Sequence, residues 1–290
     1  MILKKKESNN SVKQLQDLLL LEITESQRLL IEKEIKSIEK GDSGEKDAAY
    51  FIDFYYKDSK NWIVIHDLRI EHNGLVAQID HLLINRVLGF FILESKSYSN
   101  GVQINDSGEF EAIGNYKNYG IESPIEQNKR HIHALKLLLT ENDLLPSRLG
   151  MTITPNYFNY ILVAPDAIIK RPKRSLFNTD NVIKSDTLKT ELDRFVDKEI
   201  TVLSVFTVFP KMLSCKSLEQ LGQKIVACHK PININYLKKF KISSQKKERK
   251  QSQYSCAKCQ VNISDKAVKY CKNNKDKFNG KTYCFNCQHD

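Results

Sequence analysis

The sequence predicts a mixed α/β fold in which a central mixed sheet is flanked by helices. Short apolar segments rich in β-branched and aromatic residues follow one another between residues 62 and 98, which is typical of consecutive strands. Segments with leucine or isoleucine at helical spacing precede and follow them. Most of the seven cysteines lie close together at the end of the chain, which predicts a small separate module there.

Two helical segments are expected before the first strand. Residues 11 to about 40 carry leucine and isoleucine at roughly helical spacing among charged residues. The stretch GDSGE at residues 41–45 is expected to interrupt this helix, and a second helix with Phe51 and Tyr55 follows it. We therefore assign residues 1–40 to an N-terminal helical segment and residues 41–235 to the main α/β domain.

Three consecutive antiparallel strands are expected next. The segments WIVIHDLRI, LVAQIDHLLIN and GFFILESKSY begin at Trp62, Leu75 and Gly89. Turn residues separate them, with Asn73-Gly74 after the first segment and Gly89 at the start of the third.

Helices and one further strand are expected in the rest of the main domain. Ser123 is a good N-cap, Pro124 suits a first helical position and Glu126 completes a capping box, so a helix should begin there. A strand is expected at residues 157–167, and helices are expected at 185–195 and 216–226. Cys215 and Cys228 are interpreted as core residues. The polar, basic residues 236–253 are interpreted as a linker.

The composition favours a polyanionic partner. The chain has 45 Lys and Arg against 35 Asp and Glu, a formal net charge of +10, which suits nucleic acid better than a membrane. No apolar run is long enough to span a bilayer, and no apolar segment follows the lysines near residue 5 as a secretory signal would require. The odd cysteine count then indicates a reducing, cytoplasmic location and metal binding rather than disulfides.

Three charged residues lie in the apolar strands, where charge is unusual. Because side chains alternate along a strand, Gln78 and Asp80 should share one face, and so should Glu94 and Lys96. If the strands pair through the turn between them, Asp80, Glu94 and Lys96 meet at one end. Two nearby carboxylates are costly unless a divalent cation lies between them, and Mg²⁺ suits oxygen ligands. The alternative interpretation is a structural salt bridge from Lys96 to either carboxylate.

The pattern as a whole resembles the nuclease-related domain (NERD) family of the PD-(D/E)xK nuclease superfamily. The resemblance rests on four segments in order: SGEK at 43–46, QIDHLLI at 78–84, FILESKSYSNG at 91–101 and SPIEQNKRHIHAL at 123–135. They define a motif core at residues 41–139. The resemblance implies a restriction-endonuclease-like fold, with a central mixed sheet flanked by helices. Ser95 departs from the threonine more often expected there.

The same resemblance implies a role for each motif residue. Asp80 and Glu94 would be ligands of Mg²⁺ (or Mn²⁺), and Lys96 would be the catalytic lysine. Glu45 would be an additional acid from the preceding helix, Gln78 a neighbour of the metal or water, and Gln127 would reach the site from across the sheet. For Gln127 the alternative is a solvated residue in the first turn of its helix. By strand alternation His81 faces away from Asp80 and is interpreted as structural. His131 and His133 are interpreted as residues on a solvated helix face.

Residues 254–290 are expected to bind structural Zn²⁺. Two CxxC pairs, Cys256/Cys259 and Cys284/Cys287, have the spacing of two zinc knuckles. A redox dithiol is the alternative, and the lack of a βαβ pattern around the pairs counts against it. A segment this short has too little core to fold without such a staple. Cys271 is interpreted as a buried thiol, with a ligand role as the alternative. Seven lysines with interleaved aromatic residues favour nucleic-acid binding, and a protein-interaction module is the alternative.

These features together predict a cytoplasmic metal-dependent nuclease that hydrolyses phosphodiester bonds in DNA, with a zinc module that aids nucleic-acid binding. Two alternatives stay open. One is a non-catalytic DNA-binding or adaptor protein on a nuclease-like fold, and the other is a zinc-organised interaction protein without a nucleic-acid partner. The acidic pair with its lysine favours catalysis, because a binding surface gains little from carboxylates that face phosphate. Translocation along DNA would need a partner helicase or ATPase.

Overall fold

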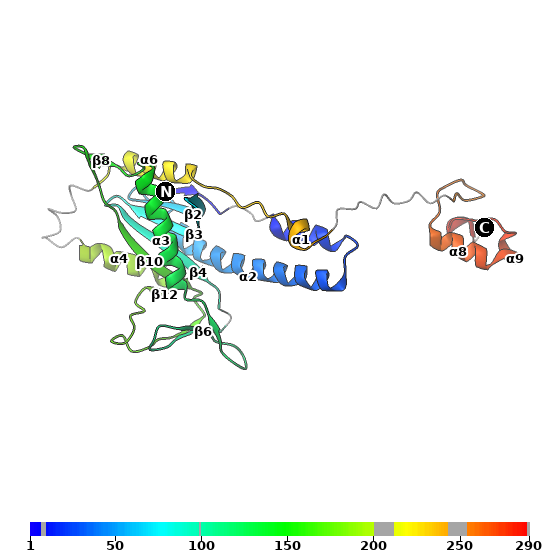
Figure 1. The fold of residues 1–290 in the computed structure, drawn as a ribbon, viewed down its shortest axis with the longest axis horizontal. Helices are drawn as coiled ribbons and strands as arrows, with labels where there is room; N and C mark the ends of the chain where they lie inside the picture. The colour runs from blue at the N-terminus through cyan, green and yellow to red at the C-terminus, as the bar shows by residue number, and fades with distance from the viewer. Residues whose placement is uncertain (7–9, 99, 200–211, 243–253, 289–290) are drawn as a thin grey trace. The chain divides into compact units, whose positions relative to one another are not determined.

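A computed structural model of the protein describes residues 1–6, 10–98, 100–199, 212–242 and 254–288. The chain divides into two compact units, Met1–Tyr236 and Leu237–Asp290. The first unit contains the central sheet and its helices, and the second contains the cysteine module (Figure 1).

A mixed six-stranded sheet forms the centre of the first unit, as predicted. Its strand order is β1-β2-β3-β4-β10-β12. The neighbours β2, β3 and β4 pair antiparallel, whereas the pairs β1–β2, β4–β10 and β10–β12 are parallel. The bounds of these strands are β1 Ile2–Lys4, β2 Trp62–His72, β3 Leu75–Asn85, β4 Gly89–Lys96, β10 Asn156–Val163 and β12 Val182–Lys184.

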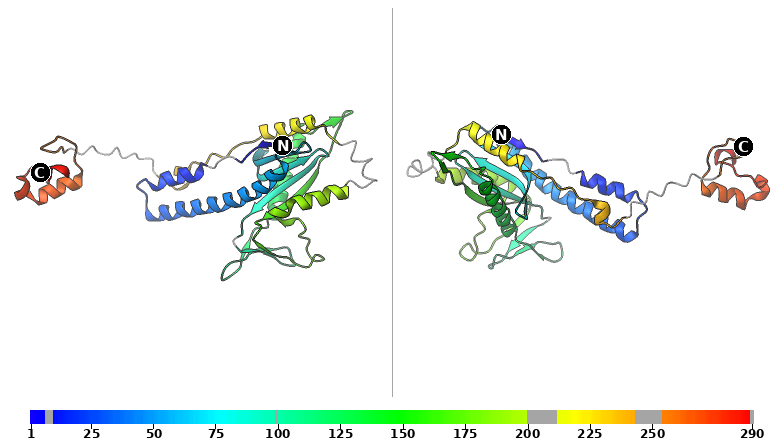
Figure 2. Two further views of the ribbon diagram at one scale, coloured as in Figure 1. Left: turned by 180° about the vertical axis from the view of Figure 1, so that it is seen from behind. Right: turned by 45° about the horizontal axis from the view of Figure 1, so that its top comes forward.

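Helices cover both faces of this sheet (Figures 1 and 2). On one face, α3 (Pro124–Glu141) and α6 (Cys215–Ala227) bury their leucines against residues such as Ile65, Ile79 and Phe90. On the other face, α2 (Glu25–Tyr56) and α4 (Leu188–Glu199, preceded by the 3₁₀ turn η1, Ser185–Thr187) pack against Leu83 and Phe91. This layering buries both faces of the central strands, which explains their nearly continuous apolar character.

A smaller four-stranded sheet combines three strands that lie between β4 and α3 in the sequence with β11, which follows β10. Its order is β11-β5-β6-β7, with bounds β5 Gly101–Ile104, β6 Phe110–Ala112, β7 Tyr119–Ile121 and β11 Ile168–Lys170. Its apolar residues, among them Val102 and Phe110, share a core with Ile161 and Val163 of β10. A short hairpin of β8 (Ser147–Arg148) and β9 (Met151–Thr152) follows α3.

The helices near the N-terminus differ from the prediction. The expected long helix ends early, as α1 (Ser11–Leu19), and α2 begins at Glu25 behind Thr24, whose capping box with Gln27 sets its start. The expected interruption at GDSGE is wrong, because α2 continues through residues 41–45 to Tyr56 (Figure 2). The expected boundary between residues 40 and 41 therefore falls inside a helix.

Two further expectations are corrected in the segments that follow α4. Cys215, expected in the core, is exposed at the first position of α6, whereas Cys228 is half-buried and packs against the core of the first unit. The expected linker at 236–253 begins with the short helix α7 (Tyr236–Lys239), and Tyr236, Phe240 and Ile242 are buried. A flexible linker would expose these side chains to solvent, so residues 236–242 do not form one. Residues 243–253 lie outside the described residues.

The cysteine module is small and mostly irregular. It contains α8 (Asp265–Asn273), α9 (Lys275–Phe278), the 3₁₀ turn η3 (Asn286–Gln288) and a single bridge between Ser255 and Asn262. Cys256, Ile263 and Val268 form its buried cluster. Among the described residues of the whole chain, no helix is both long enough and apolar enough to cross a membrane.

Candidate active site

Strands β3 and β4 separate where the charged residues begin. Their pairing ends at His81 and Leu93, while β4 stays paired with β10 as far as Lys96. Beyond that point the Ser95 N–H donates to Asp80 Oδ2 at 2.7 Å. A side-chain carboxylate thus takes the place of a backbone carbonyl of β3 as the acceptor. The separation thereby places Asp80 beside the end of β4, as the alternation of the two strands predicts.

Glu94, Lys96 and Gln127 form a closed triangle of hydrogen bonds. Glu94 Oε1 accepts from Lys96 Nζ and from Gln127 Nε2, each at 2.8 Å, and Lys96 Nζ also donates to Gln127 Oε1 at 3.0 Å. Glu94 is 3% exposed, so the ion pair with Lys96 is shielded from water on the glutamate side. The structure thus brings together three predicted site residues from β4 and α3.

The other oxygen of Glu94 is buried without a hydrogen bond. Glu94 Oε2 has no hydrogen-bond partner, and neither does the buried His131 Nδ1 that lies 3.5 Å from it. The interpretation of His131 as a solvated residue is therefore wrong, whereas His133 is exposed as expected. A buried carboxylate oxygen without a hydrogen bond is costly, and a cation is the natural partner for it.

The two carboxyl groups of Asp80 and Glu94 differ in their affinity for protons. Burial, then the charges of Glu94 and Glu45, raise the pKa of Asp80 well above its usual value. Burial also opposes the ionisation of Glu94, but His131 and Lys96 outweigh it and lower the pKa of Glu94. The pair thus favours one negative charge and one proton, and this proton is what a divalent cation would displace.

Glu45 approaches the site because α2 passes close to the end of β4. A Cβ added to Gly44 would lie 2.8 Å from Ser97 Cβ, so only glycine permits this contact. The Glu45 carboxylate accepts from Lys6 Nζ at 2.6 Å, and Lys6 also pairs with Asp42 at 2.6 Å. Burial, with Asp67 and Asp42, raises the pKa of Glu45 in spite of Lys6. Glu45 is therefore near Asp80 but turned toward a lysine.

Gln78 has a different partner from the one predicted. It is exposed, and its Nε2 donates to Asp67 Oδ1 at 2.8 Å. Gln78, Asp67 and Glu45 line a cavity of about 600 Å³ together with Lys6 and Arg69. Gln78 is thus linked to the acidic pair through this cavity and Glu45, not through a described contact with Asp80 or Glu94.

Asn128 is an additional residue of this site. It is fully buried, and its Nδ2 donates to Ile92 O of β4 at 2.8 Å and to Asn159 Oδ1 of β10 at 2.9 Å. Asn159 in turn donates to Ile125 O of α3 at 3.0 Å. These bonds fix the first turns of α3 against the two strands, and they explain why Gln127 points at Glu94.

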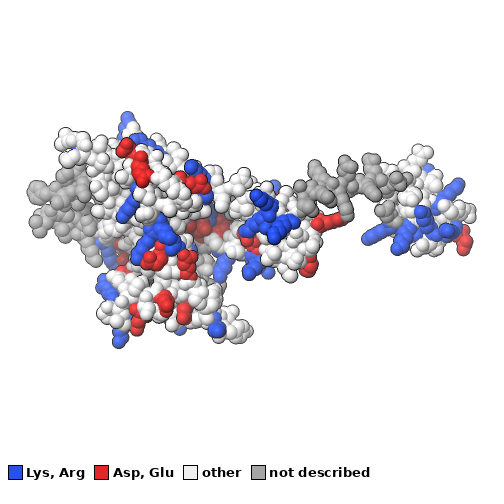
Figure 3. Space-filling model, viewed as in Figure 1, with Lys and Arg blue, Asp and Glu red and all other residues white. Residues whose placement is uncertain are grey.

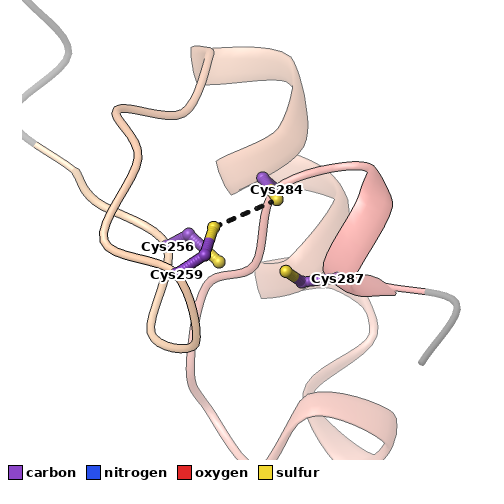
Figure 4. A group of neighbouring side chains, drawn as sticks. All are labelled: Cys256, Cys259, Cys284 and Cys287. Atoms are coloured by element: carbon purple, nitrogen blue, oxygen red, sulfur yellow. Dashed lines mark hydrogen bonds between the residues drawn. The ribbon is translucent and has the colours of Figure 1, made fainter.

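The four cysteines of the CxxC pairs converge, as the spacing predicts. Their sulfur atoms all lie within 4.8 Å of one another, and Cys259 Sγ is 3.6 Å from Cys284 Sγ (Figure 4). Within the described residues, this is the one group of three or more metal-binding side chains close enough to share an ion. The cluster is compatible with a structural zinc site.

Cys271 lies outside that cluster. It is fully buried, and its sulfur accepts the Tyr283 N–H at 3.3 Å. These contacts support its interpretation as a buried thiol. Because Tyr283 directly precedes Cys284, the bond also helps to orient the second knuckle.

Comparison with known proteins agrees with the resemblance stated above. Residues 40–164 match the family model described as nuclease-related domain. The match begins just before Gly44 and Glu45 and ends just after β10, so it spans every predicted residue of the acidic site. No curated protein and no solved structure matches the chain.

Proposed function

From a chain that carries a nuclease-related domain at residues 40–164, we infer a metal-dependent nuclease that hydrolyses phosphodiester bonds in DNA. One observation supports this most strongly. Glu94 presents a buried oxygen without a hydrogen bond, beside a second carboxyl group, Asp80, whose pKa is raised by burial and by Glu94 itself. This donor set suits a hard divalent cation such as Mg²⁺ or Mn²⁺.

Asp80 and Glu94 would hold the cation, which when bound acts as a Lewis acid and lowers the pKa of a bound water. Lys96 Nζ uses two of its three protons on Glu94 and Gln127, so the third can point at a phosphate oxygen or the attacking water. Gln127 holds the lysine in place. The first turn of α3, from which Gln127 extends, carries the partial positive charge that suits a phosphate.

The cysteine module supports a nucleic-acid substrate. Its lysines are all exposed and leave a basic surface, namely Lys258, Lys266, Lys269, Lys272, Lys275, Lys277 and Lys281 (Figure 3). Of its aromatic residues, Tyr270 and Phe285 are 50% and 74% exposed and could stack on bases, whereas Phe278 belongs to the interior. We propose that Zn²⁺ on the four cysteines folds this module and that the module binds DNA.

Cleavage of supercoiled plasmid by the zinc-loaded chain tests the proposed reaction. With Mg²⁺ or Mn²⁺, the Glu94→Gln and Lys96→Met variants should each lose about 10²–10⁴-fold in rate, because Glu94 would hold the cation and Lys96 would act on the phosphate or the attacking water. The control is Lys129→Met, which removes an exposed lysine of α3 that pairs with Glu126. It should cut at nearly the wild-type rate.

Two results would contradict the proposal in different ways. Equal cleavage by wild type and both site variants would exclude this mechanism. Salt-sensitive binding of DNA by the wild type without cleavage under any divalent metal would instead favour the non-catalytic DNA-binding protein.

A further inference from the structure

Four side chains on the α2 side of the sheet form a continuous chain of hydrogen bonds. Asp53 Oδ1 lies 2.9 Å from His66 Nε2, His66 Nδ1 lies 2.7 Å from His81 Nδ1, and His81 Nε2 lies 3.0 Å from Ser95 Oγ. The residues come from α2, β2, β3 and β4, so the chain crosses three strands. The proposed chemistry uses none of them directly.

The proton positions in this chain of hydrogen bonds follow from Asp53, the acceptor at one end. The Asp53 carboxylate oxygen is the acceptor of its bond to His66, so His66 Nε2 carries the proton of that bond. The two Nδ1 atoms lie 2.7 Å apart, so only one of them can carry a proton, and a charged imidazolium would be costly in rings that are 1% and 0% exposed. A neutral His66 then accepts at Nδ1 from the His81 Nδ1–H, and His81 accepts at Nε2 from the Ser95 hydroxyl. In this arrangement each of the three hydrogen bonds has one donor and one acceptor.

Ser95 joins this chain to the acidic site. Its hydroxyl is held by His81 on one face of the sheet, while its backbone N–H donates to Asp80 Oδ2 at 2.7 Å. Because β3 and β4 no longer pair at this point, no ladder bond fixes the peptide of Ser95 relative to β3. The bond to His81 supplies that restraint.

We propose that Asp53, His66, His81 and Ser95 are positioning residues that hold Asp80 in the orientation for binding a divalent cation, with His66 as the Nε2–H tautomer and His81 as the Nδ1–H tautomer. The tautomers are a property of the fold alone. The effect on the cation rests on the proposed function. The two parts are therefore measured separately.

Imidazole ¹⁵N and ¹H NMR on the full zinc-loaded chain tests the tautomers. Spectra of His66→Asn and His81→Asn variants assign the two rings. We expect a proton on Nε2 alone in His66 and on Nδ1 alone in His81 at neutral pH. A proton on His81 Nε2, or a doubly protonated ring at either position, would overturn the assigned chain of donors.

The affinity for Mn²⁺, measured by calorimetry on the zinc-loaded chain, tests the positioning role. Ser95→Ala keeps the N–H but removes the hydroxyl, and it should weaken Mn²⁺ binding about 10–100-fold and lower kcat with little change in KM for DNA. Ser95→Thr restores a hydroxyl and should restore both values. Ser97→Ala, two residues along the same segment, is the control and should bind Mn²⁺ like the wild type.

The outcomes separate this inference from the proposed nuclease. Mn²⁺ binding that is equal in wild type and Ser95→Ala would refute the positioning role while leaving the nuclease intact. Absence of Mn²⁺ binding by the wild type would refute the proposed metal site, and the NMR measurement would still decide whether the hydrogen-bond chain exists.

Discussion

At the scale of single residues, the acidic pair costs the apo protein stability. Asp80 and Glu94 are adjacent, one of them is 3% exposed, and the oxygen nearest His131 has no hydrogen bond. Packing and hydrogen bonds elsewhere must compensate for this cost. Residues that weaken the fold but suit a ligand are typical of functional sites.

Replacing Asp80 by asparagine should therefore stabilise the zinc-loaded protein when Mg²⁺ and Mn²⁺ are absent. The folded-state pKa of Asp80 is raised above its usual 3.8, so the folded state keeps a proton that the unfolded state releases. Wild-type stability must then fall as pH rises above about 4, and Asp80→Asn removes this loss. At pH 8 we expect a gain on the order of 1 kcal/mol, or about 2–4 °C in Tm.

Thermal unfolding at pH 8 and pH 4 checks this expectation. The gain should shrink at pH 4, where Asp80 is protonated in the folded state, and added Mg²⁺ should stabilise only the wild type. Asp106→Asn, in an exposed turn, is the control and should change little. A variant no more stable than the wild type at pH 8 would show that Asp80 is not destabilised by its neighbours.

His131 and Asn128 show what residue-level reasoning could and could not find. His131 lies four residues after Gln127, and this spacing places both on one face of α3, so the pattern contained a signal for it. Asn128 lies in the same quoted segment, SPIEQNKRHIHAL, but nothing in the local pattern indicated its partners. Its importance depends on the carbonyl of Ile92 and the amide of Asn159, which come close to it only in the folded sheet.

At the scale of elements, α2 shows tertiary packing outweighing local propensity. Two glycines lie within it, and each costs a helix about 0.5–1 kcal/mol relative to alanine. The helix continues because Ile52 and Tyr56 are buried against the sheet and because Lys46 pairs with Asp42 at 2.6 Å. Gly44 is also needed for the approach to Ser97.

These two glycines form a matched pair for a test. Gly41→Ala meets nothing within 4 Å, so it should raise the free energy of unfolding by about 0.5–1 kcal/mol. Gly44→Ala gains the same propensity but places Cβ 2.8 Å from Ser97 Cβ, so it should lower the free energy of unfolding by about 1–3 kcal/mol. It should also reduce cleavage, because the helix that carries Glu45 must move.

Urea unfolding followed by helical circular dichroism measures both effects. If Gly44→Ala proved as stable as Gly41→Ala, the close contact between α2 and the end of β4 would be wrong. If Gly44→Ala were destabilised but still cleaved DNA at the wild-type rate, cleavage would not depend on the position of Glu45 in the structure.

At the scale of the whole molecule, the two units have different sources of stability. The first buries large clusters on both faces of a six-stranded sheet, whereas the second has a small cluster around Cys256, Ile263 and Val268. So small a core cannot offset the conformational entropy lost on folding unless a bound metal adds stability. The second unit should therefore depend on metal and the first should not.

Removal of zinc is expected to unfold the second unit alone. A Cys256→Ser, Cys284→Ser double variant should lose its zinc, measured by metal analysis, because it keeps only one thiolate of each knuckle. Its DNA affinity should fall, with a shallower dependence on salt, if the module binds phosphate. The circular dichroism signal of the full chain should fall only by the small share that the second unit contributes, because the first unit stays folded.

Cys215→Ser is the matched control, since Cys215 is exposed and lies outside the cluster. It should keep both zinc and DNA affinity. A double variant that retained full DNA affinity would assign nucleic-acid binding to the first unit instead, and a double variant that retained zinc would exclude the four-cysteine site.

By itself the sequence determined the features that depend on local period and spacing. Alternation in LVAQIDHLLIN and GFFILESKSY predicted the antiparallel pair and placed Asp80 near Glu94 and Lys96. The two CxxC pairs predicted the converging thiols. These inferences succeeded because strand pleating and the CxxC turn are short-range geometry, which a few residues decide.

Only the tertiary structure decided which distant groups complete the site. Lys6 reaches Glu45 because β1 lies parallel beside β2, and His131 reaches Glu94 because Asn128 fixes α3 on the sheet. The chain from Asp53 to Ser95 likewise needs α2 against three strands. Such contacts join residues far apart in sequence, and the balance of packing over the whole unit, not local propensity, sets where they meet.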